Sequence, residues 1–345
     1  MFLSQSSPAL LLAPMADVTN PAFRRICISH GADFTYTEMI HSDGFLNGDL
    51  YAQRRGYSID EMPYGIKIVG NNAPSISKAA LGLEKLFSPI AKVIDINMGC
   101  PAPPIIKTGC GAALLSAARG TQSHPVTIIQ RVVKTVETPV SAKIRIYRTP
   151  EKTLALAKSL EKAGASVLTV HGRTKEQGYS GKADWDVIRQ IKEELSIPVV
   201  LNGNVFTPKD LEKAIEKTNC DGYMIGRGAV GNPFIFKKMK HFLKTGEPLF
   251  LTETEEFEQR LSDFKVYAAL LSKYDLLPYV NVKAHAQWFT TGLAESREMR
   301  LSINLLHKDV KIRNLPVDEL VQEREALIEG IIRIFEKGVE NCQKI

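Results

Sequence analysis

The sequence predicts an α/β architecture, a (β/α)8 TIM barrel followed by a smaller C-terminal α-helical domain, and three observations support this prediction. Short apolar runs alternate with amphipathic helical windows through roughly the first 240 residues. Eight such strand–helix pairs follow one another at a spacing of about 30 residues, the size of a βαβ unit. After about residue 245 the strand patterns stop and helical periodicity alone continues.

The eight expected strands are short, rich in Val, Ile and Leu, and bounded by Gly, Pro or Asn, as strands buried on both faces of a parallel sheet are. They are Leu10–Ala13, Phe34–Thr37, Gly65–Val69, Val93–Asn97, Val140–Ile144, Val167–His171, Val199–Asn202 and Gly222–Ile225. The rival fold is a doubly wound open sheet. It is disfavoured because the first strand–helix turn contains no G-x-G-x-x-G motif.

Helix-start signals separate these strands, since Asn or Thr precedes a proline suited to the first helical position. The expected helices between strands include Pro21–His30, Pro150–Ala163, Asp184–Leu195 and Lys209–Lys217. The C-terminal windows with apolar residues at three- and four-residue steps are Phe257–Leu271, Val280–Thr290, Ser296–Leu306 and Val317–Phe335. We therefore expect a catalytic barrel over residues 1–244 and a helical domain over residues 245–345.

Composition excludes several classes of protein. The 345 residues include 44 basic and 38 acidic side chains, a net charge of +6, and this balance excludes a disordered acidic chain and a fibre. The five cysteines form no C-x-x-C pair, which disfavours a zinc ribbon or a disulfide framework. No basic leader or long apolar run is present. We expect a cytoplasmic monomer with no membrane segment and no metal ion.

Chemistry in such a barrel lies where the strands end at their carboxyl side. That rule selects candidates from seven of the eight strands. They are Pro14, Met15 and Ala16 after strand one, Lys67 in strand three, Asn97 and Cys100 at strand four, Lys143 and Arg145 in strand five, His171 and Arg173 at strand six, Asn202, Gly203 and Asn204 at strand seven, and Gly226 and Arg227 at strand eight.

The glycine turns after strands seven and eight, at Gly203 and Gly226, occupy the places where barrels commonly bind phosphate. Glycine lets the backbone approach a ligand, and Arg227 adds a charged donor. A single glycine turn is more often only a tight turn. Two such turns at both phosphate positions, with an arginine, favour an anion site.

Lys143 and His171 lie on neighbouring strands and together suit a planar cofactor that gathers negative charge on reduction, such as a flavin. A snorkelling lysine and a structural histidine are equally good explanations of either residue alone. Cys100 is a candidate general acid or nucleophile, with a small buried hydrophobe as the alternative. Cys110 competes for the same role, but Cys100 is closer to the end of its strand.

Together these motifs resemble those of the tRNA-dihydrouridine synthases over the whole barrel and in the same order. The matching segments are residues 12–24 (LAPMADVTNPAFR), 95–101 (DINMGCP), 143–145 (KIR), 171–174 (HGRT), 177–185 (QGYSGKADW), 202–204 (NGN), 226–228 (GRG) and 232–233 (NP). The C-terminal domain matches more weakly, mainly around residues 283–289 (KAHAQWF).

The resemblance implies an FMN-dependent reduction of the C5=C6 bond of uridines in tRNA, with hydride passing from flavin N5 to C6, Cys100 protonating C5, and NADPH reducing the flavin. It also implies roles for the other candidates. Pro14, Met15, Ala16, Lys143 and His171 would hold the flavin ring, Asn202, Gly203, Asn204, Gly226 and Arg227 its phosphate, and Asn97 and Arg173 the uridine, with Arg145 also assigned to the substrate.

One position departs from the family pattern. A glutamine usually ends strand three there and reads the flavin edge, whereas this sequence has Lys67. A lysine can donate to a flavin carbonyl but cannot accept from the ring N–H. Either Lys67 reads the flavin differently, or another residue occupies that place.

Charge is unevenly spread along the chain. Residues 245–345 hold 13 basic and 17 acidic side chains, yet residues 260–313 hold nine basic and five acidic ones. With the resemblance in mind, we expect a basic stripe for tRNA. It would run from the barrel mouth across Lys283, Arg297, Arg300, Lys308, Lys311 and Arg313. Ordinary solvated helix faces are the alternative. Two other functions stay open, an FMN enzyme of free pyrimidines and a non-catalytic RNA-binding barrel.

Overall fold

The computed structural model describes residues 8–49, 63–306 and 315–343. These residues form two compact units, described separately below. The first comprises residues 1–21 and 32–226, and the second comprises residues 22–31 and 227–345. The division that the sequence predicts, at residues 244 and 245, falls within the second of these units.

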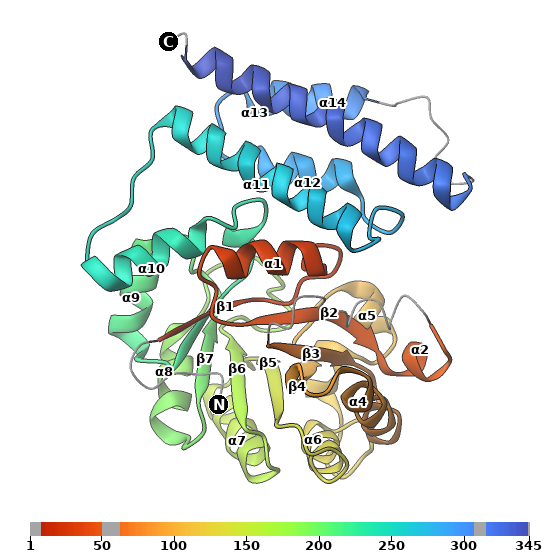
Figure 1. Ribbon diagram of the computed structural model, residues 1–345. Coiled ribbons are helices and arrows are strands. Elements are labelled where there is room, and N and C mark those ends of the chain that lie inside the picture. The colour runs from red at the N-terminus through yellow and green to blue at the C-terminus, as the bar shows by residue number, and fades with distance from the viewer. Residues whose placement is uncertain (1–7, 50–62, 307–314, 344–345) are drawn as a thin grey trace. The chain divides into compact units, whose positions relative to one another are not determined.

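The first unit is a (β/α)8 barrel, as the sequence predicts (Figure 1). Its eight strands pair in parallel in the order β1-β8-β7-β6-β5-β4-β3-β2. The strands are β1 (Ala9–Leu12), β2 (Thr35–His41), β3 (Tyr64–Val69), β4 (Ala91–Met98), β5 (Val140–Arg145), β6 (Val167–His171), β7 (Val199–Asn202) and β8 (Gly222–Ile225).

The two end strands of this order, β1 and β2, are joined through an isolated parallel bridge between Leu11 and Phe34. Leu12 N donates to Phe34 O at 2.9 Å and Asp33 N to Leu10 O at 2.8 Å. The Asp33 carboxylate adds a bond by accepting from Leu10 N at 2.7 Å. These contacts bring the first and last strands of the sheet together.

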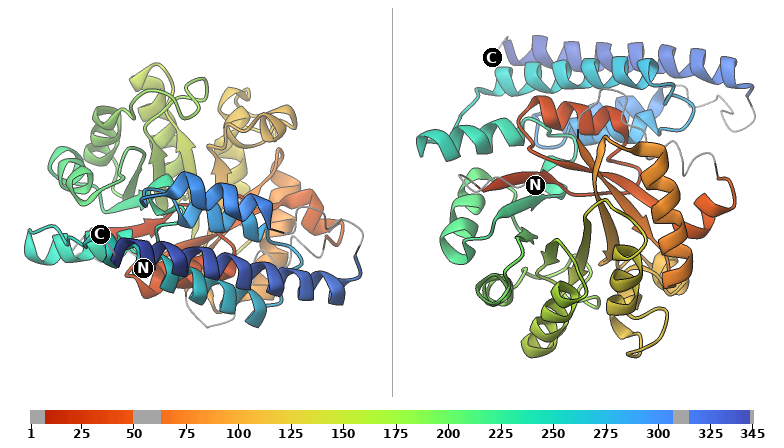
Figure 2. Two further views of the ribbon diagram at one scale, coloured as in Figure 1. Left: turned by 90° about the horizontal axis from the view of Figure 1, so that it is seen from above. Right: turned by 60° about the horizontal axis from the view of Figure 1, so that its bottom comes forward.

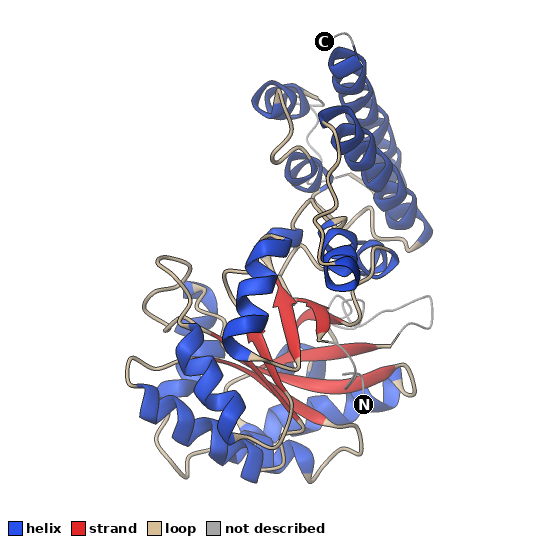
Figure 3. Ribbon diagram, turned by 90° about the vertical axis from the view of Figure 1, so that its left-hand side faces the viewer, coloured by secondary structure: helices blue, strands red, loops and turns tan. Residues whose placement is uncertain are grey.

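Helices cover the outside of the strands (Figures 2 and 3). They are α4 (Ala73–Phe87), α6 (Pro125–Val133), α7 (Pro150–Lys162), α8 (Trp185–Glu194) and α9 (Pro208–Thr218), with the short α2 (Ser42–Leu46), α5 (Pro103–Lys107) and a 3₁₀ turn η1 (Gly111–Ser116). Not every predicted start signal acts as a side-chain cap, since Thr149 makes no such hydrogen bond at α7, but two helices are capped. Asp184 accepts from the first turn of α8, and Thr207 and Asp210 form a capping box at α9.

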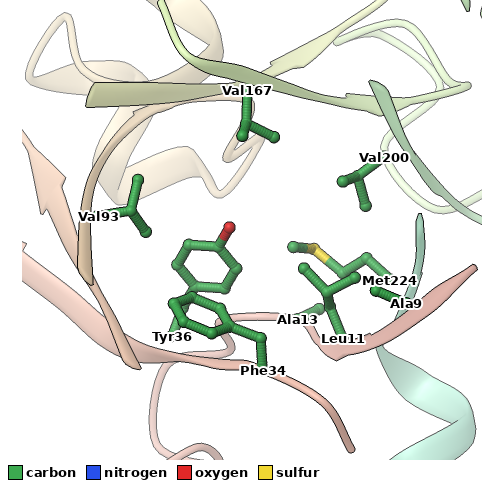
Figure 4. Close-up of a cluster of buried hydrophobic side chains, with 9 residues drawn as sticks. All are labelled: Ala9, Leu11, Ala13, Phe34, Tyr36, Val93, Val167, Val200 and Met224. Atoms are coloured by element: carbon green, nitrogen blue, oxygen red, sulfur yellow. The ribbon is translucent and has the colours of Figure 1, made fainter. Parts of the chain in front are cut away.

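The lower interior of the barrel is apolar (Figure 4). Alternate residues of the strands point inward because the side-chain period of a strand is two. Val93, Val167, Val200 and Met224 lie around the barrel interior in one cluster with Tyr36, whose hydroxyl points into the interior. This packed apolar layer, called the apolar floor below, lies directly beneath the polar residues in the upper part of the barrel.

The second unit consists of α1 (Pro21–Ser29) from residue 22 onward, a 3₁₀ turn η2 (Arg227–Ala229), α10 (Ile235–Thr245), α11 (Glu253–Lys273), α12 (Val282–Phe289), α13 (Ser296–Leu305) and α14 (Val317–Gln343). Helices α11 and α14 lie side by side in Figures 1 and 2. Phe264 of α11 stacks on Phe335 of α14 with ring centroids 5.6 Å apart.

A hydrogen bond of 2.7 Å joins His30 Nε2 to Asp263 Oδ1 of α11. No described helix combines the length and apolarity needed to cross a membrane.

Candidate active site at the barrel mouth

Above the apolar floor, three strands place a polar row inside the barrel. Lys67 of β3, Asp95 of β4 and Ser141 of β5 are in register on adjacent strands. The Lys67 ammonium donates to Asp95 Oδ2, and Ser141 Oγ donates to Asp95 Oδ1 at 2.7 Å. All three side chains are buried. Burial lowers the pKa of Lys67, and the charge of Asp95 opposes that shift.

Two residues further along β5, and so on the same face, Lys143 stands in register with Asn97 of β4 and Thr169 of β6. Its Nζ donates to Asn202 Oδ1 of β7 at 2.9 Å, and Asn202 Nδ2 donates to Met224 O at 2.8 Å. Burial, with the nearby charges of Lys67 and Arg145, lowers the pKa of Lys143 to about 7. Lys143 is therefore an amine that changes charge near neutral pH.

Cys100 lies in the turn that follows β4 and is half-buried. Asn97 Oδ1 accepts from the backbone N–H groups of Gly99 at 3.1 Å and Cys100 at 3.0 Å, so it shapes this turn from within. The Cys100 carbonyl accepts from Ala112 N at 3.0 Å. Gly111, at φ +60°, allows this approach, because a Cβ there would lie 2.7 Å from the Cys100 carbonyl oxygen.

Cys110, the competing thiol, is fully buried. Its sulfur lies 3.9 Å from His41 Nε2 and 3.6 Å from the carbonyl oxygen of Thr108. Burial raises the pKa of the Cys110 thiol, which makes it a weaker acid than a thiol in water. Of the two candidate thiols, Cys110 is therefore the more deeply buried, and Cys100 is half-buried.

His171, at the end of β6, is buried and in register with Asn202. Its Nε2 is 3.2 Å from Arg173 Nη1. Because a guanidinium can only donate, His171 Nε2 is the acceptor, and the imidazole then carries its proton on Nδ1. Gly203 packs against this ring at φ +114°, and a Cβ on Gly203 would approach His171 Cδ2 to 2.9 Å.

Arg173 is buried and fastens two loops. Its Nε donates to Ser180 O at 3.0 Å, and its Nη2 donates to Gly181 O at 2.7 Å and to Asn204 Oδ1 at 2.6 Å. Asn204 has a left-handed backbone, φ 63°, and its Oδ1 also accepts from Ala183 N at 2.8 Å. The structure therefore joins the loops after β6 and β7 through this arginine.

Arg145 performs a similar function between the loops after β4 and β6. It is 1% exposed, and its guanidinium donates to Gly99 O at 2.7 Å, Thr174 O at 3.0 Å and Gly178 O at 2.8 Å. Its guanidinium also lies 5.7 Å from the ring centroid of Tyr179, an exposed aromatic at the mouth. Arg145 thus links the turn of Cys100 to the loop that carries Tyr179.

The turn after β1 places Pro14 and Met15 half-buried and Ala16 exposed. Thr19 Oγ1 accepts from Met15 N and donates to Met15 O, both at 3.0 Å, which closes the turn. Gly226 ends the barrel unit, and a Cβ there would meet Ala13 at 3.6 Å and the Met15 sulfur at 4.0 Å. Arg227 is exposed in η2 and belongs to the second unit.

The expected tRNA contacts of the helical unit divide into three groups. Lys283 of α12 donates to the carbonyls of Leu306 and, at 3.3 Å, Asn304, so it satisfies the C-terminal end of α13. Arg297 is exposed on α13 and Arg300 is half-buried. Lys308, Lys311 and Arg313 lie outside the described residues.

The structure adds residues that sequence reasoning did not single out. Ser141 and Thr169 lie on strands already predicted, and the period of two could have placed them inside the barrel with Lys143 and His171. The Thr169 hydroxyl is buried with no hydrogen-bond partner among the described residues. Tyr179 is 60% exposed, and the only feature of the sequence that could have identified it is its place in the segment 177–185. No metal-binding cluster of His, Cys, Asp and Glu occurs in the described part of the chain.

Comparison with known proteins gives one family. Residues 11–325 match the family described as Dihydrouridine synthase (Dus). A tRNA-dihydrouridine synthase B of Pseudomonas putida is 36% identical over 324 residues, 93% of each chain. One of Pseudomonas syringae pv. tomato is 37% identical over 86% of this chain and 87% of its own. A probable tRNA-dihydrouridine synthase of Aquifex aeolicus is 33% identical over 85% and 90%.

Proposed function

The chain belongs to the dihydrouridine synthase family, and from this premise we propose that it is an oxidoreductase that reduces the C5=C6 bond of selected uridines in tRNA. The observation that carries the proposal is the position of Cys100. This thiol is half-buried at the end of β4, in the barrel mouth that also holds Lys143 and His171. A tRNA substrate is consistent with the cytoplasmic location that the sequence predicts.

The residues at the mouth fit FMN. Gly226 leaves its backbone open to a ligand, because even a Cβ there would come no closer than 3.6 Å to Ala13, whereas Gly203 packs tightly against the His171 ring and positions it. The donor set also suits an anionic ring. Lys143 can supply a positive charge, and the neutral His171 can donate a hydrogen bond, where a reduced flavin becomes negative. We assign the flavin ring to Pro14, Met15, Ala16, Lys143 and His171, and its phosphate to Asn202, Gly203, Asn204, Gly226 and Arg227.

FMN, when bound and reduced by NADPH, supplies the hydride for C6 of the uracil. The chain supplies the rest. Cys100 gives the proton to C5, and its turn is held in place by Asn97, Gly111 and, through the Gly99 carbonyl, Arg145. The target base must leave its stack to reach a pocket of this kind, as in other enzymes that modify bases.

The experiment that tests the proposed function compares substrates. We expect the purified protein to carry a flavin absorbing near about 450 nm, and reduced flavin to be reoxidised by unmodified tRNA but far more slowly by free uridine or orotate. Equal turnover with a free base would favour an enzyme of free pyrimidines. A colourless protein that still binds tRNA would favour a non-catalytic RNA-binding barrel.

The role of Cys100 is tested by replacing it with alanine. Cys100→Ala is expected to keep the flavin and lose tRNA reduction by about 10²- to 10⁴-fold, because a positioned general acid contributes that much. Cys110→Ala is the matched control, since Cys110 is fully buried and should leave turnover near the wild-type rate. Single-turnover reoxidation of the flavin by tRNA measures both. Normal turnover of Cys100→Ala, with loss in Cys110→Ala, would reassign the acid to Cys110.

A further inference from the structure

The polar row beneath the mouth holds Lys67 and Asp95, and a second lysine, Lys143, lies just above it. Lys67 and Asp95 form an ion pair with side chains only 1% and 2% exposed. Lys143 lies on the strand next to Asp95, one inward-facing position closer to the mouth, after Ser141. Whether the Asp95 carboxylate pairs with Lys67 or with Lys143 therefore decides whether the Lys143 amine at the mouth has a counter-ion.

Both oxygens of Asp95 are occupied. Oδ2 accepts from the Lys67 ammonium and Oδ1 from Ser141 Oγ at 2.7 Å. Lys143 Nζ is directed instead to Asn202 Oδ1 at 2.9 Å, which is the oxygen of a neutral amide. The Asn202 amide is in turn fixed by its own donation to Met224 O at 2.8 Å, so its oxygen faces Lys143.

We propose that Lys67 is a positioning residue that takes up the carboxylate of Asp95 and thereby leaves Lys143 with a neutral partner at the barrel mouth. The barrel thus keeps at its mouth an amine whose described hydrogen-bond partner is a neutral amide. The connection to flavin chemistry rests on the proposed function, but the arrangement of the two lysines does not.

The charged groups that face Lys143 come from several elements. Lys67 of β3 and Arg145 of β5 disfavour its charged form, whereas Asp95 of β4 and Cys100 after β4 favour it. From β6, His171 lies in register with Arg145 rather than with Lys143, and its Nε2 accepts from Arg173. From β7 the contact is the neutral Asn202. Burial and two cations outweigh the opposing groups, and the pKa of Lys143 falls to about 7.

A neutral-poised Lys143 makes the mouth responsive to pH. Below about pH 7 the amine is charged and attracts an anionic ligand, and above that pH it is neutral and no longer does so. Without Lys67, Asp95 would lose its ion-pair partner, and Lys143 would become the nearest amine able to serve it. Lys143 would then stay charged to higher pH.

The test is a titration of Lys143 in the full-length protein as purified, with ¹³C-labelled lysine and the Cε resonance followed by NMR from pH 5 to 11. Comparison with Lys143→Arg assigns the resonance. In the wild-type protein Lys143 should titrate near pH 7. Lys67→Gln removes the charge but keeps an amide donor for Asp95, and it should shift the midpoint upward by about one unit or more.

Three controls separate this role from a general disturbance of the barrel. Lys67→Arg keeps the charge and should leave the Lys143 midpoint unchanged. Lys67→Gln/Asp95→Asn removes the released carboxylate and should abolish the upward shift. Lys78→Met, at an exposed position on α4, should have no effect.

The proposal is overturned if Lys143 of the wild-type protein titrates near its ordinary value of 10.5, which needs no variant to fold. It is also overturned if Lys67→Gln leaves the midpoint in place. Because the titration follows a lysine resonance, its result does not depend on whether the protein reduces tRNA. Failure of the proposed function would show in the substrate comparison and leave this titration untouched.

Discussion

At the scale of single residues, the mouth of this barrel is organised by hydrogen bonds to backbone. Arg145 and Arg173 are both buried, and together they donate to five backbone carbonyl oxygens. A guanidinium suits this work because its donors are fixed in a planar fork. The turn of Cys100 and the loop of Tyr179 are thereby held together by buried guanidinium donors.

The pKa of Lys143 has a consequence for stability. Its value is about 7 in the folded protein against an ordinary 10.5. Between these values the unfolded chain holds a proton that the folded protein has released, so stability rises with pH across this window. The cost of a charged Lys143 in the fold is fully present below pH 7 and is gone by 10.5.

We therefore expect wild-type stability to increase, relative to Lys143→Met, as the pH is raised from 7 to 10.5. Urea unfolding at closely spaced pH values measures the difference between the two proteins. Lys78→Met, which replaces an exposed lysine, should differ from wild type by a constant amount. Parallel curves for wild type and Lys143→Met would contradict a lowered pKa.

At the scale of elements, the sequence predicts the strands well and some of the helices less so. The predicted Val167–His171 and Val199–Asn202 are found unchanged as β6 and β7. Strand β2 runs further than expected, to His41, because a register shift between Tyr36 and Met39 lets it continue along β3. No local pattern announces such an irregularity, since it is fixed by the pairing strand.

Helix α14 also exceeds its prediction, extending to Gln343 instead of Phe335. The added part contains Gly338, a residue that weakens an isolated helix. In the fold Gly338 packs against Phe257 of α11, where a Cβ would lie 2.6 Å from the ring. The helix continues because tertiary packing compensates for the poor local propensity, which sequence periodicity does not register.

Lys283 illustrates how an element changes the meaning of a residue. The sequence suggests a phosphate contact, whereas in the structure its ammonium donates to carbonyls at the end of α13. We expect Lys283→Met to destabilise the protein by about 1 kcal/mol, the usual net value of such hydrogen bonds. Chemical denaturation measures it, with Lys273→Met on α11 as an exposed control. A loss of tRNA affinity without any loss of stability would restore the phosphate role.

At the scale of the whole molecule, the net charge of +6 is the sum of a basic first part and an acidic second part. Residues 1–244 hold 31 basic and 21 acidic side chains, and residues 245–345 hold 13 and 17. The acidic side chains concentrate at 247–258 and 318–340, leaving Arg297 and Arg300 in a locally basic stretch. This distribution is the basis for expecting Arg297 and Arg300 of α13 to contact the phosphate backbone of tRNA.

We expect tRNA binding to weaken steeply with salt, because each phosphate contact releases a counterion. The double variant Arg297→Gln/Arg300→Gln should reduce the slope of log affinity against log salt by about two if each side chain neutralises one phosphate. Filter binding at salt concentrations from about 50 to about 300 mM measures this slope. Arg333→Gln, on the exposed face of α14 and paired with Glu329, is the control and should leave the slope unchanged. An unaltered slope in the double variant would remove α13 from the interface.

The sequence by itself determined the eight strands and their order along the chain, because periodicity and turn signals are local properties of the chain. It also brought Cys100, Lys143 and His171 to one mouth, since parallel strands end at one rim. Only the tertiary structure decided the partners. Lys143 donates across β6 to Asn202, and Lys67 donates to Asp95. Barrel closure and strand register set these distances, and no local pattern in the sequence encodes them.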